Sequence, residues 1–433
     1  MKVLYDISVL GQGYSNPVCR AGIFRVVEAV AQGLMANEAC ELTFCASGSF
    51  LLLDFTLKYL ETDLQFANVD FSYSRRDRFI ETSFNELINE TLTELNQQVL
   101  KTKGLQQTLL KLVRKPVFQA YLHTRNLHPL NSASVRQADI FHSTSYPLTA
   151  KTKQHKQPQN FLTFYDLIPI LYPQFFPSSQ NDLSQVILQS LDLNDWAICI
   201  SHATKADLCN LRTDIDPDRV FVTHLAASDL FHARSEPEGI MAVRRKYNLP
   251  DAPYFLSLST LEPRKNIDHT IRCFAKLIQQ ENLPDLYLVL VGNKGWDYDK
   301  IFKEIDSLEF LRDRIILTGF IANEDLAAVY SSALAFVYLS FYEGFGLPPL
   351  EAMQCGIPVI TSNTSSLPEV VGNAGIMLDP NDDDGLCQSM LRVVNQSFLR
   401  QTMALKSLEQ AQQFSWQKCI QETIAAYKVA LSS

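Results

Sequence analysis

Apolar residues in the first half of the chain fall either into short unbroken runs or into helical spacing. The run at 3–7 predicts a strand, and a loop containing Gly11, Gly13 and Gly22 is expected to follow it. A helix comes next, because apolar positions then repeat at intervals of three and four (Ile23, Val26, Val27, Val30 and Leu34). Unbroken apolar runs without alternation predict further buried strands at 140–142, 161–164, 196–200 and 220–223.

The second half repeats this alternation more regularly. Short apolar runs predict strands at 254–258, 286–291, 315–317, 335–339 and 359–360, with helical segments between them. Alternating strands and helices give a parallel sheet with right-handed crossover connections. We therefore expect an α/β protein with two Rossmann-like domains, whose parallel sheets face each other across a ligand-binding cleft.

The domain boundaries follow from the same pattern. An N-terminal domain is expected over 1–240, with a helical insertion at about 78–125, and a second domain over 241–396. The closing segment, 397–433, is helical by pattern and could run back to the first domain.

Composition and cysteine usage narrow the class of protein. Hydrophobic residues make up 46% and charged residues 20% of the 433, which is ordinary for a globular protein. No apolar run reaches the roughly 18–20 residues of a membrane-spanning helix, and the first residues do not resemble a signal peptide. The nine cysteines form no C-x-x-C pair, which favours reduced thiols and a cytoplasmic location.

The stretch 341–353 is the most informative part of the sequence. It follows a predicted strand, and Gly344 and Gly346, on either side of Phe345, allow the backbone to approach a ligand closely. Pro348 and Pro349 then mark the start of a helix. Glu343 in the loop and Glu351 about a turn into this helix could accept hydrogen bonds from two different parts of one hydroxyl-rich ligand.

Two other loops also follow predicted strands. Arg264 and Lys265 are adjacent cations that can neutralise a diphosphate. Ser365 and Ser366 precede a further helix, and Ser366 and Glu369 have the spacing of a capping box. Helix capping and phosphate binding use the same geometry, so both interpretations of these serines stay open.

Together these features resemble a known family. Two glutamates separated by seven residues around Gly-Phe-Gly-Leu-Pro, with an Arg-Lys pair upstream, are similar to the signature of family 4 retaining glycosyltransferases of the GT-B fold. The resemblance is close over 250–380 and hardly present over 50–137. It implies a nucleoside-diphosphate sugar as co-substrate, no other cofactor, and same-face transfer of the sugar.

The resemblance also implies roles for these side chains. Glu343 would bind hydroxyls of the donor sugar, Glu351 the ribose, and Arg264 and Lys265 the diphosphate. Because these two cations can do the work of a divalent ion, we expect a metal-independent enzyme.

The first domain supplies weaker candidates. Gly22 and Arg25 match a glycine-rich loop of the family near the donor phosphates, although Phe24 replaces a second glycine. His142, near a strand end, matches a position that touches the transferred sugar, while a lone histidine is more often structural. Asp166 ends the next strand and either faces the cleft or caps the following turn.

The substrates are less defined than the reaction class. Resemblance of the Glu-Pro-Arg-Lys-Asn loop to mannosyltransferases of surface-polysaccharide assembly favours GDP-mannose as donor, with a glycan or lipid-linked acceptor. One alternative is a catalytically silent protein that binds sugar nucleotides or acts as a scaffold. The other is an NAD-dependent dehydrogenase, which the incomplete G-x-G-x-x-G motif at Gly11 and Gly13 disfavours.

A basic segment extends from 101 to 156. It carries ten Lys and Arg side chains and one acid, Asp139. Leucines at helical spacing within it could dock on an anionic membrane at the inner face, or the segment is an ordinary helix with a solvated basic face. Aromatic residues are sparse here, so no nucleic acid is expected.

Overall fold

The computed structural model describes residues 1–16, 20, 22–66, 69–79, 128–154, 157–176 and 178–433. The predicted insertion at about 78–125 lies almost wholly outside these residues, as does most of the basic segment. The chain divides into two compact units. Unit 1 contains Met1–Thr163, Ser190–Trp196 and Tyr427–Ser433, and unit 2 contains Phe164–Gln189 and Ala197–Ala426.

The first sheet has seven strands in the order β3-β2-β1-β4-β5-β6-β7. The pairs β1–β2, β1–β4, β2–β3, β4–β5 and β6–β7 are parallel, and Val3 of β1 lies opposite Leu42 of β2 and Ile140 of β4. Its strands are β1 (Lys2–Asp6), β2 (Glu41–Cys45), β3 (Phe71–Ser72), β4 (Ile140–Ser143), β5 (Gln159–Phe164), β6 (Trp196–Cys199) and β7 (Val220–Val222). Almost every residue of β1, β4 and β6 is buried, as the unbroken apolar runs predict.

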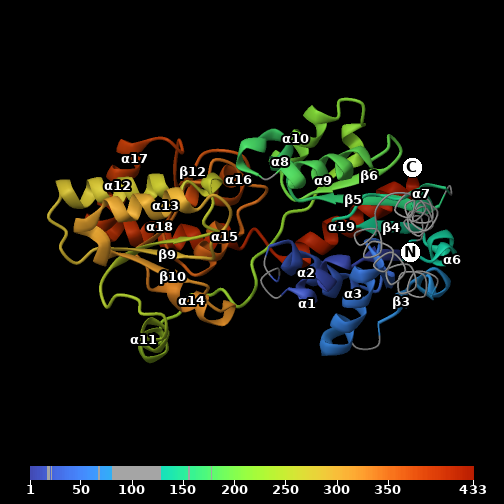
Figure 1. Cartoon of the computed structure of the whole chain (residues 1–433), viewed down its shortest axis with the longest axis horizontal. Helices are drawn as coiled ribbons and strands as arrows, with labels where there is room; N and C mark the ends of the chain where they lie inside the picture. Colours follow the sequence, from blue (N-terminus) through green and yellow to red (C-terminus); the bar gives the residue numbers. More distant parts are fainter. Residues whose placement is uncertain (17–19, 21, 67–68, 80–127, 155–156, 177) are drawn as a thin grey trace, which may run out of the picture. The chain divides into compact units, whose positions relative to one another are not determined.

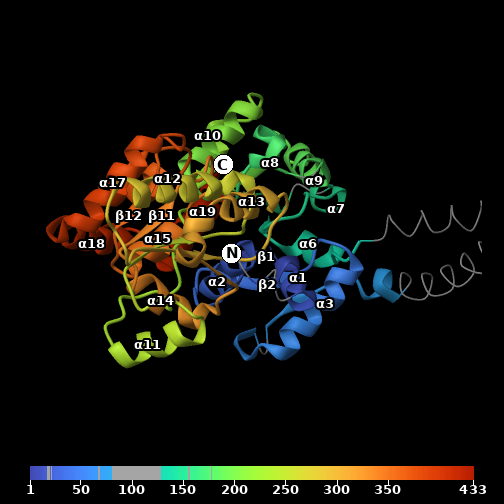
Figure 2. The same cartoon turned by 60° about the vertical axis from the view of Figure 1, so that its left-hand side comes forward.

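A helix replaces the predicted glycine loop after β1. Helix α1 (Ser8–Ser15) includes Gly11 and Gly13 and packs against α3 (Phe50–Thr62), and the two lie side by side in Figure 2. A Cβ on Gly11 would lie 2.5 Å from Thr56 Oγ1 and 2.7 Å from the Leu52 carbonyl oxygen. The predicted loop is therefore wrong at Gly11 and Gly13, which lie in a helix. Gly11 has no side chain, and this permits close packing of α1 against α3.

The remaining described helices before the second sheet have between four and 13 residues. They are α2 (Ile23–Met35), α6 (Ser132–Gln137), α7 (Ala150–Lys153), α8 (Ile168–Leu171), α9 (Ser178–Gln189), α10 (His202–Leu211) and α11 (Pro237–Lys246). The 3-10 turns are η2 (Leu64–Phe66), η3 (Pro173–Phe175) and η4 (Pro217–Arg219). In α2 the predicted apolar face is buried at Val26, Val27, Val30 and Leu34.

The second sheet lies in unit 2 and has six parallel strands in the order β10-β9-β8-β11-β12-β13. They are β8 (Tyr254–Leu258), β9 (Tyr287–Val291), β10 (Ile315–Gly319), β11 (Ala335–Tyr338), β12 (Val359–Ser362) and β13 (Ile376–Leu378). This order places β8, β11 and β12 next to one another, so the loops after these strands meet at one edge of the sheet.

Helices cover both faces of this sheet, with α12 above and α14 below its strands in the view of Figure 1. The helices that follow β8 in the chain are α12 (Ile267–Gln280), α13 (Asp299–Ser307), α14 (Asn323–Ser331), α15 (Leu347–Gln354), α16 (Leu367–Val371), α17 (Asp383–Asn395), α18 (Ser397–Ala411) and α19 (Trp416–Ser432). The 3-10 turns are η5 (Pro263–Lys265), η6 (Glu309–Arg314) and η7 (Gly372–Ala374). Helix α12 buries Ile267, Ile271 and Phe274 against the strands. The last part of α19, from Tyr427 on, belongs to unit 1.

Candidate active site

Three loops of unit 2 carry the candidate site. They follow β8, β11 and β12 and contain Arg264 and Lys265, Glu343, and Ser365 and Ser366, respectively. Helix α15 begins at Leu347 with prolines in its first turn, as the sequence predicts. The loops after β8 and β11 are joined through their backbones, because the N–H of Phe341 donates to the Arg264 carbonyl at 2.9 Å.

Glu343 joins the two cations. Its Oε2 lies 2.9 Å from Arg264 Nη1, and its Oε1 lies 2.6 Å from Lys265 Nζ. The three side chains are only 10–11% exposed. The structure thus brings together three residues that the sequence places on two separate loops.

Two further side chains complete this ion-pair cluster, and the sequence analysis gave neither a role. Glu262 Oε1 lies 2.8 Å from Arg264 Nη2. The Tyr338 hydroxyl donates to Glu343 Oε1 at 2.8 Å and accepts from Lys265 Nζ at 2.8 Å. Glu262 belongs to the same loop as Arg264, so its sequence position was a usable signal. Tyr338 ends a buried strand and offered none.

Electrostatics keep Glu343 and Arg264 ionised despite their burial. Burial alone would raise the pKa of Glu343, but Arg264 and Lys265 outweigh it and lower that pKa to about 2. Burial and the neighbouring Arg264 lower the pKa of Lys265, and Glu343 opposes them. Burial also lowers the pKa of Arg264, but Glu343 and Glu262 outweigh it and raise that pKa. Glu343 is therefore a buried carboxylate held between two basic side chains.

Glycines and serines hold the Glu343 loop in place. A Cβ on Gly344 would lie 2.1 Å from the Tyr165 carbonyl oxygen, and Gly346 has a φ of 115°. Both positions therefore require glycine. The Ser365 hydroxyl accepts from the Glu343 N–H at 2.9 Å, and the Ser366 hydroxyl donates to the carbonyls of Glu343 and Phe345 at 3.0 and 2.7 Å.

The capping box expected at Ser366 and Glu369 is wrong. The Ser366 side chain makes no cap hydrogen bond, because it is used on the Glu343 loop. The Glu369 carboxylate instead accepts from the N–H groups of His202 and Ala203 at 2.9 and 3.2 Å, at the start of α10. Phosphate binding at the start of α16, the other interpretation of these serines, stays a prediction.

The other predicted donor residues of unit 2 lie in defined surroundings. Glu351 is 2% exposed, and the Tyr330 hydroxyl donates to its Oε2 at 3.1 Å. The Phe345 ring is buried against Phe414 at 5.8 Å between centroids, so this side chain is directed into the protein.

Asp166 makes the capping contact considered for it, and its cleft-facing role stays a prediction. Its Oδ1 accepts from the Ile168 N–H at 3.0 Å, as expected of a residue that caps the following turn. Burial raises the pKa of Asp166, while Arg264 opposes this. Its carboxylate therefore also feels the charges of the Glu343 cluster.

The candidates of unit 1 form no comparable cluster among the described residues. Gly22 has a φ of 51° and precedes α2, and Arg25 is half-buried in the first turn of that helix. Phe24, which replaces the family's second glycine, is buried, and a Cβ on Gly13 would lie 2.3 Å from its ring. An aromatic ring thus occupies space beside Gly13.

His142 has the surroundings of a structural residue. Its Nδ1 lies 2.5 Å from the Tyr427 hydroxyl and its Nε2 lies 2.7 Å from Thr163 Oγ1. Burial lowers the pKa of His142 to about 3. Both ring nitrogens therefore have partners in unit 1, which favours the structural interpretation, and the contact of His142 with the transferred sugar stays a prediction.

Two groups among the described residues have a composition that could hold a metal ion. One comprises His202, His224 and Glu369, and the other His269, Cys273 and Asp383. Internal hydrogen bonds account for both, such as His269 Nε2 to Asp383 Oδ1 at 2.7 Å. Neither group includes a member of the Glu343 cluster.

The described part of the basic segment is largely engaged within unit 1. Lys151 Nζ lies 2.9 Å from Asp77, and Lys153 Nζ lies 2.7 Å from Asp192. These two lysines therefore add little to a basic surface. Among the helices that the structure describes, none combines the length and apolar character needed to cross a bilayer.

Comparison with known proteins identifies similar sequences. Residues 241–410 match the family described as Glycosyl transferases group 1. The O-antigen chain mannosyltransferase B of Escherichia coli is 34% identical over 339 residues, which cover 77% of this chain and 86% of that protein. The serotype-specific mannosyltransferase WbdA of E. coli is 32% identical over 257 residues, which cover 58% of this chain but only 31% of that protein.

Solved structures agree on the fold. Sucrose-phosphate synthase from Thermosynechococcus elongatus has a TM-score of 0.63 at 18% identity, covering 100% of this chain and 99% of its own. Anabaena Alr3699/HepE, solved in complex with UDP and glucose, has a TM-score of 0.65 at 16% identity, covering 99% of this chain and 100% of its own. With the two parallel sheets, these likenesses show that the fold is GT-B.

Proposed function

Because this chain belongs to the group 1 glycosyltransferases, we propose that it transfers mannose from GDP-mannose to a glycan acceptor with retention of configuration. The observation that carries the proposal is the buried cluster of Glu343, Arg264 and Lys265. The mannosyltransferases among its relatives support the choice of sugar.

In the proposed reaction the two cations stabilise the leaving group. As the bond from the sugar to the diphosphate breaks, negative charge grows on the diphosphate, and Arg264 and Lys265 are fixed in position before the reaction begins. Arg264 Nε is buried without a hydrogen-bond partner in the described part of the chain. An oxygen of the bound sugar nucleotide would accept a hydrogen bond from this N–H. A buried N–H group without such a partner is costly.

The glutamates would position the donor. Glu343 would exchange part of its contact with the cations for hydroxyls of the sugar, and Glu351 would bind the ribose. The departing phosphate would assist removal of the acceptor's proton. With both cations available, we propose that no metal ion is required, although Asp297 and Asp299 have an Asp-x-Asp spacing after β9. Undiminished turnover in excess EDTA would support this.

Release of GDP from GDP-mannose tests the proposal directly. Glu343→Gln and Arg264→Lys should each lower turnover by roughly a hundredfold, as expected when one transition-state contact is lost. Glu309→Gln and Arg312→Lys are matched controls, because both residues are exposed in η6. Turnover at the wild-type level in Glu343→Gln would contradict the assigned role. Absence of GDP release from the wild-type chain would favour a silent binding protein.

We place the acceptor at the inner face of the membrane, as a lipid-linked or free glycan. The support is the composition of the segment 101–156, of which 101–127 lies outside the described residues. Flotation with vesicles containing anionic lipid tests this contact. Absence of binding at low ionic strength would remove it.

A further inference from the structure

A pocket of unit 2 adjoins the Glu343 cluster without containing any of its residues. Its volume is roughly 370 Å³, within the range of about 300–1,000 Å³ typical of small-ligand sites. Pro263 and Asn266 line it from the turn that carries Arg264 and Lys265, and Phe341 lines it from the loop that carries Glu343. A ligand bound here would therefore lie next to the proposed reaction centre.

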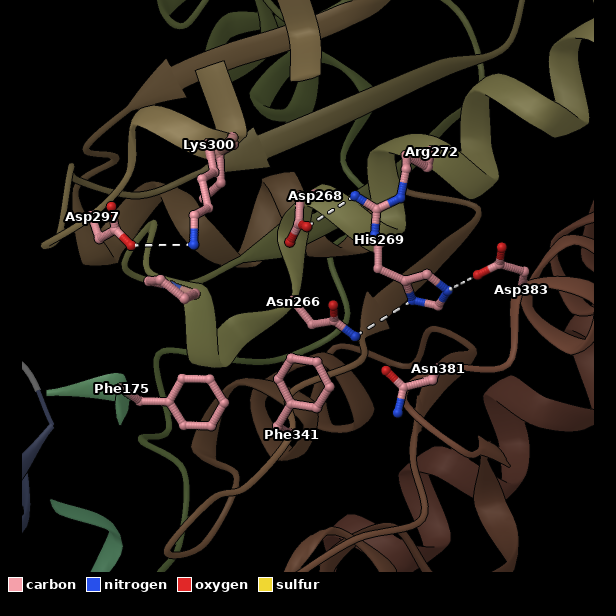
Figure 3. A pocket seen from close by; sticks show the side chains of 12 residues that line it. Phe175, Asn266, Asp268, His269, Arg272, Asp297, Lys300, Phe341, Asn381 and Asp383 are labelled. Atoms are coloured by element: carbon pink, nitrogen blue, oxygen red, sulfur yellow. Dashed lines mark hydrogen bonds and ion pairs between the residues drawn. The ribbon is translucent and has the colours of Figure 1, made fainter. Parts of the chain in front are cut away.

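Two aromatic rings form part of the wall. Phe175 and Phe341 stack with their planes 13° apart and their centroids 5.6 Å apart. Both rings are half-buried and lie beside one another in Figure 3. They offer apolar surface to a ligand that carries C–H groups on one face.

The remaining wall is polar, with donors and acceptors interleaved. Asp268 pairs with Arg272 at 2.9 Å, and Asp297 with Lys300 at 3.6 Å. Figure 3 shows these pairs on different sides of the pocket. Each carboxylate has further lone pairs for a hydroxyl, and each cation has further N–H groups.

The charge balance selects the kind of ligand. The pocket contains three carboxylates, including Asp383, and two permanent cations, so it has no positive surplus for a phosphate. The carboxylates are already paired, Asp383 with His269 at 2.7 Å, which disfavours a simple cation site. A neutral ring with several hydroxyls and apolar C–H faces fits both kinds of wall.

We propose that this pocket binds one hexopyranose unit of the glycan acceptor, beyond the sugar that receives the transferred residue. The inference rests on the proposed function, because it takes the acceptor to be a glycan. Phe175 and Phe341 would contact one face of the ring, and Asp297, Lys300 and Asn381 would hydrogen-bond its hydroxyls. The subsite makes a chain of sugars a better ligand than a single one.

Equilibrium binding of mannotriose to the full chain, without donor, tests the subsite. Lys300→Ala and Phe175→Ala should each weaken mannotriose binding roughly tenfold, the size expected from losing one good contact. Lys303→Ala on the same helix and Phe398→Ala are controls, because both side chains are exposed outside the pocket. Methyl α-mannoside should bind more weakly than mannotriose. Thermal unfolding of each variant would show that it is folded, and Asn381→Ala provides a second rim variant.

The outcomes separate the two proposals. Mannotriose affinity at the wild-type level in Lys300→Ala, Phe175→Ala and Asn381→Ala would overturn the subsite, as would a wild-type chain that releases GDP but does not bind mannotriose. A wild-type chain that binds mannotriose in a Lys300-dependent way but releases no GDP would support the subsite and contradict the proposed function.

Discussion

Glu343 is the side chain on which the charge balance of the site depends. Its carboxylate contacts both Arg264 and Lys265, and Glu262 contacts only Arg264. Removing the Glu343 charge would leave Lys265 without an acidic partner in the ion-pair cluster. Uncompensated buried charge is strongly destabilising, so Glu343 contributes to stability as well as to the proposed chemistry.

The pKa of Glu343 predicts how stability depends on pH. It is lowered in the folded chain to about 2, from an ordinary value of 4.5, so its stabilising contribution is complete above pH 4.5 and is lost as pH falls toward 2. In that window one group changes the free energy of unfolding by up to about 1.4 kcal/mol per pH unit. The free energy of unfolding, measured by urea denaturation, should fall less steeply between pH 5 and pH 3 in Glu343→Gln than in the wild type. Equal slopes in the two proteins would contradict this.

For single residues, the sequence predicted the charged side chains of the site better than the contacts that polar side chains make. Glu343, Arg264 and Lys265 stand in loops after strands, where cleft-facing side chains are expected, and the structure brings them together. Ser366 and Glu369 have capping-box spacing, yet each bonds to another segment, because tertiary contacts compete with local ones. Sequence spacing alone cannot reveal such long-range partners.

Tyr427 predicts a stability effect in unit 1. Tyr427→Phe removes the hydroxyl that contacts His142 Nδ1, leaving a buried ring nitrogen without this partner. We expect a loss of about 1–3 kcal/mol in the free energy of unfolding. Thermal or urea denaturation measures it, with Tyr287→Phe as control, because Tyr287 is only partly buried. A Tyr427→Phe variant as stable as the wild type would exclude a structural role for this contact.

At the scale of elements, glycine has two different uses in this chain. In α1, Gly11 permits contact with the backbone of α3. In α11, a Cβ on Gly239 would meet nothing within 4 Å. The sequence shows the same residue in both helices, and only the neighbouring element distinguishes them.

These surroundings predict opposite effects of one substitution. Gly11→Ala would place Cβ 2.5 Å from Thr56 Oγ1 and should destabilise the chain by about 1–3 kcal/mol. Gly239→Ala lies within a helix and should be neutral or stabilise by up to about 1 kcal/mol. Urea denaturation of both variants checks this pair. A stabilising Gly11→Ala would show that α1 and α3 can separate at little cost.

The predicted strands were those with buried apolar runs. No apolar run predicts β2, which contains Glu41 and Thr43, or the short strands β3 and β13, whose residues are only half-buried. Helix α1 was missed because Gly11 and Gly13 are poor helix formers, and packing against α3 overrides this preference. Unbroken apolar runs thus identified most strands, including the edge strands β7 and β10, whereas β2, which lies between β1 and β3, was missed because polar residues interrupt its run.

At the scale of the whole molecule, the candidate donor residues are unevenly divided. Glu343, Glu351, Arg264 and Lys265 belong to unit 2, as does Asp166, although it follows a strand of the first sheet. Gly22 and Arg25 belong to unit 1. If the donor binds as proposed, most of its binding free energy comes from contacts with unit 2.

This division predicts where the nucleotide stabilises the chain. GDP at a hundred times its dissociation constant should stabilise the folded chain relative to the unfolded chain by about 2.7 kcal/mol and raise the unfolding temperature. Hydrogen exchange should then slow most in unit 2, at 254–266 and 338–346, and less at β1 and β2 of unit 1. Arg264→Lys should reduce the shift, and the exposed Arg312→Lys should not. Protection confined to unit 1 would place the nucleotide elsewhere, because a ligand slows exchange chiefly in the segments that it orders.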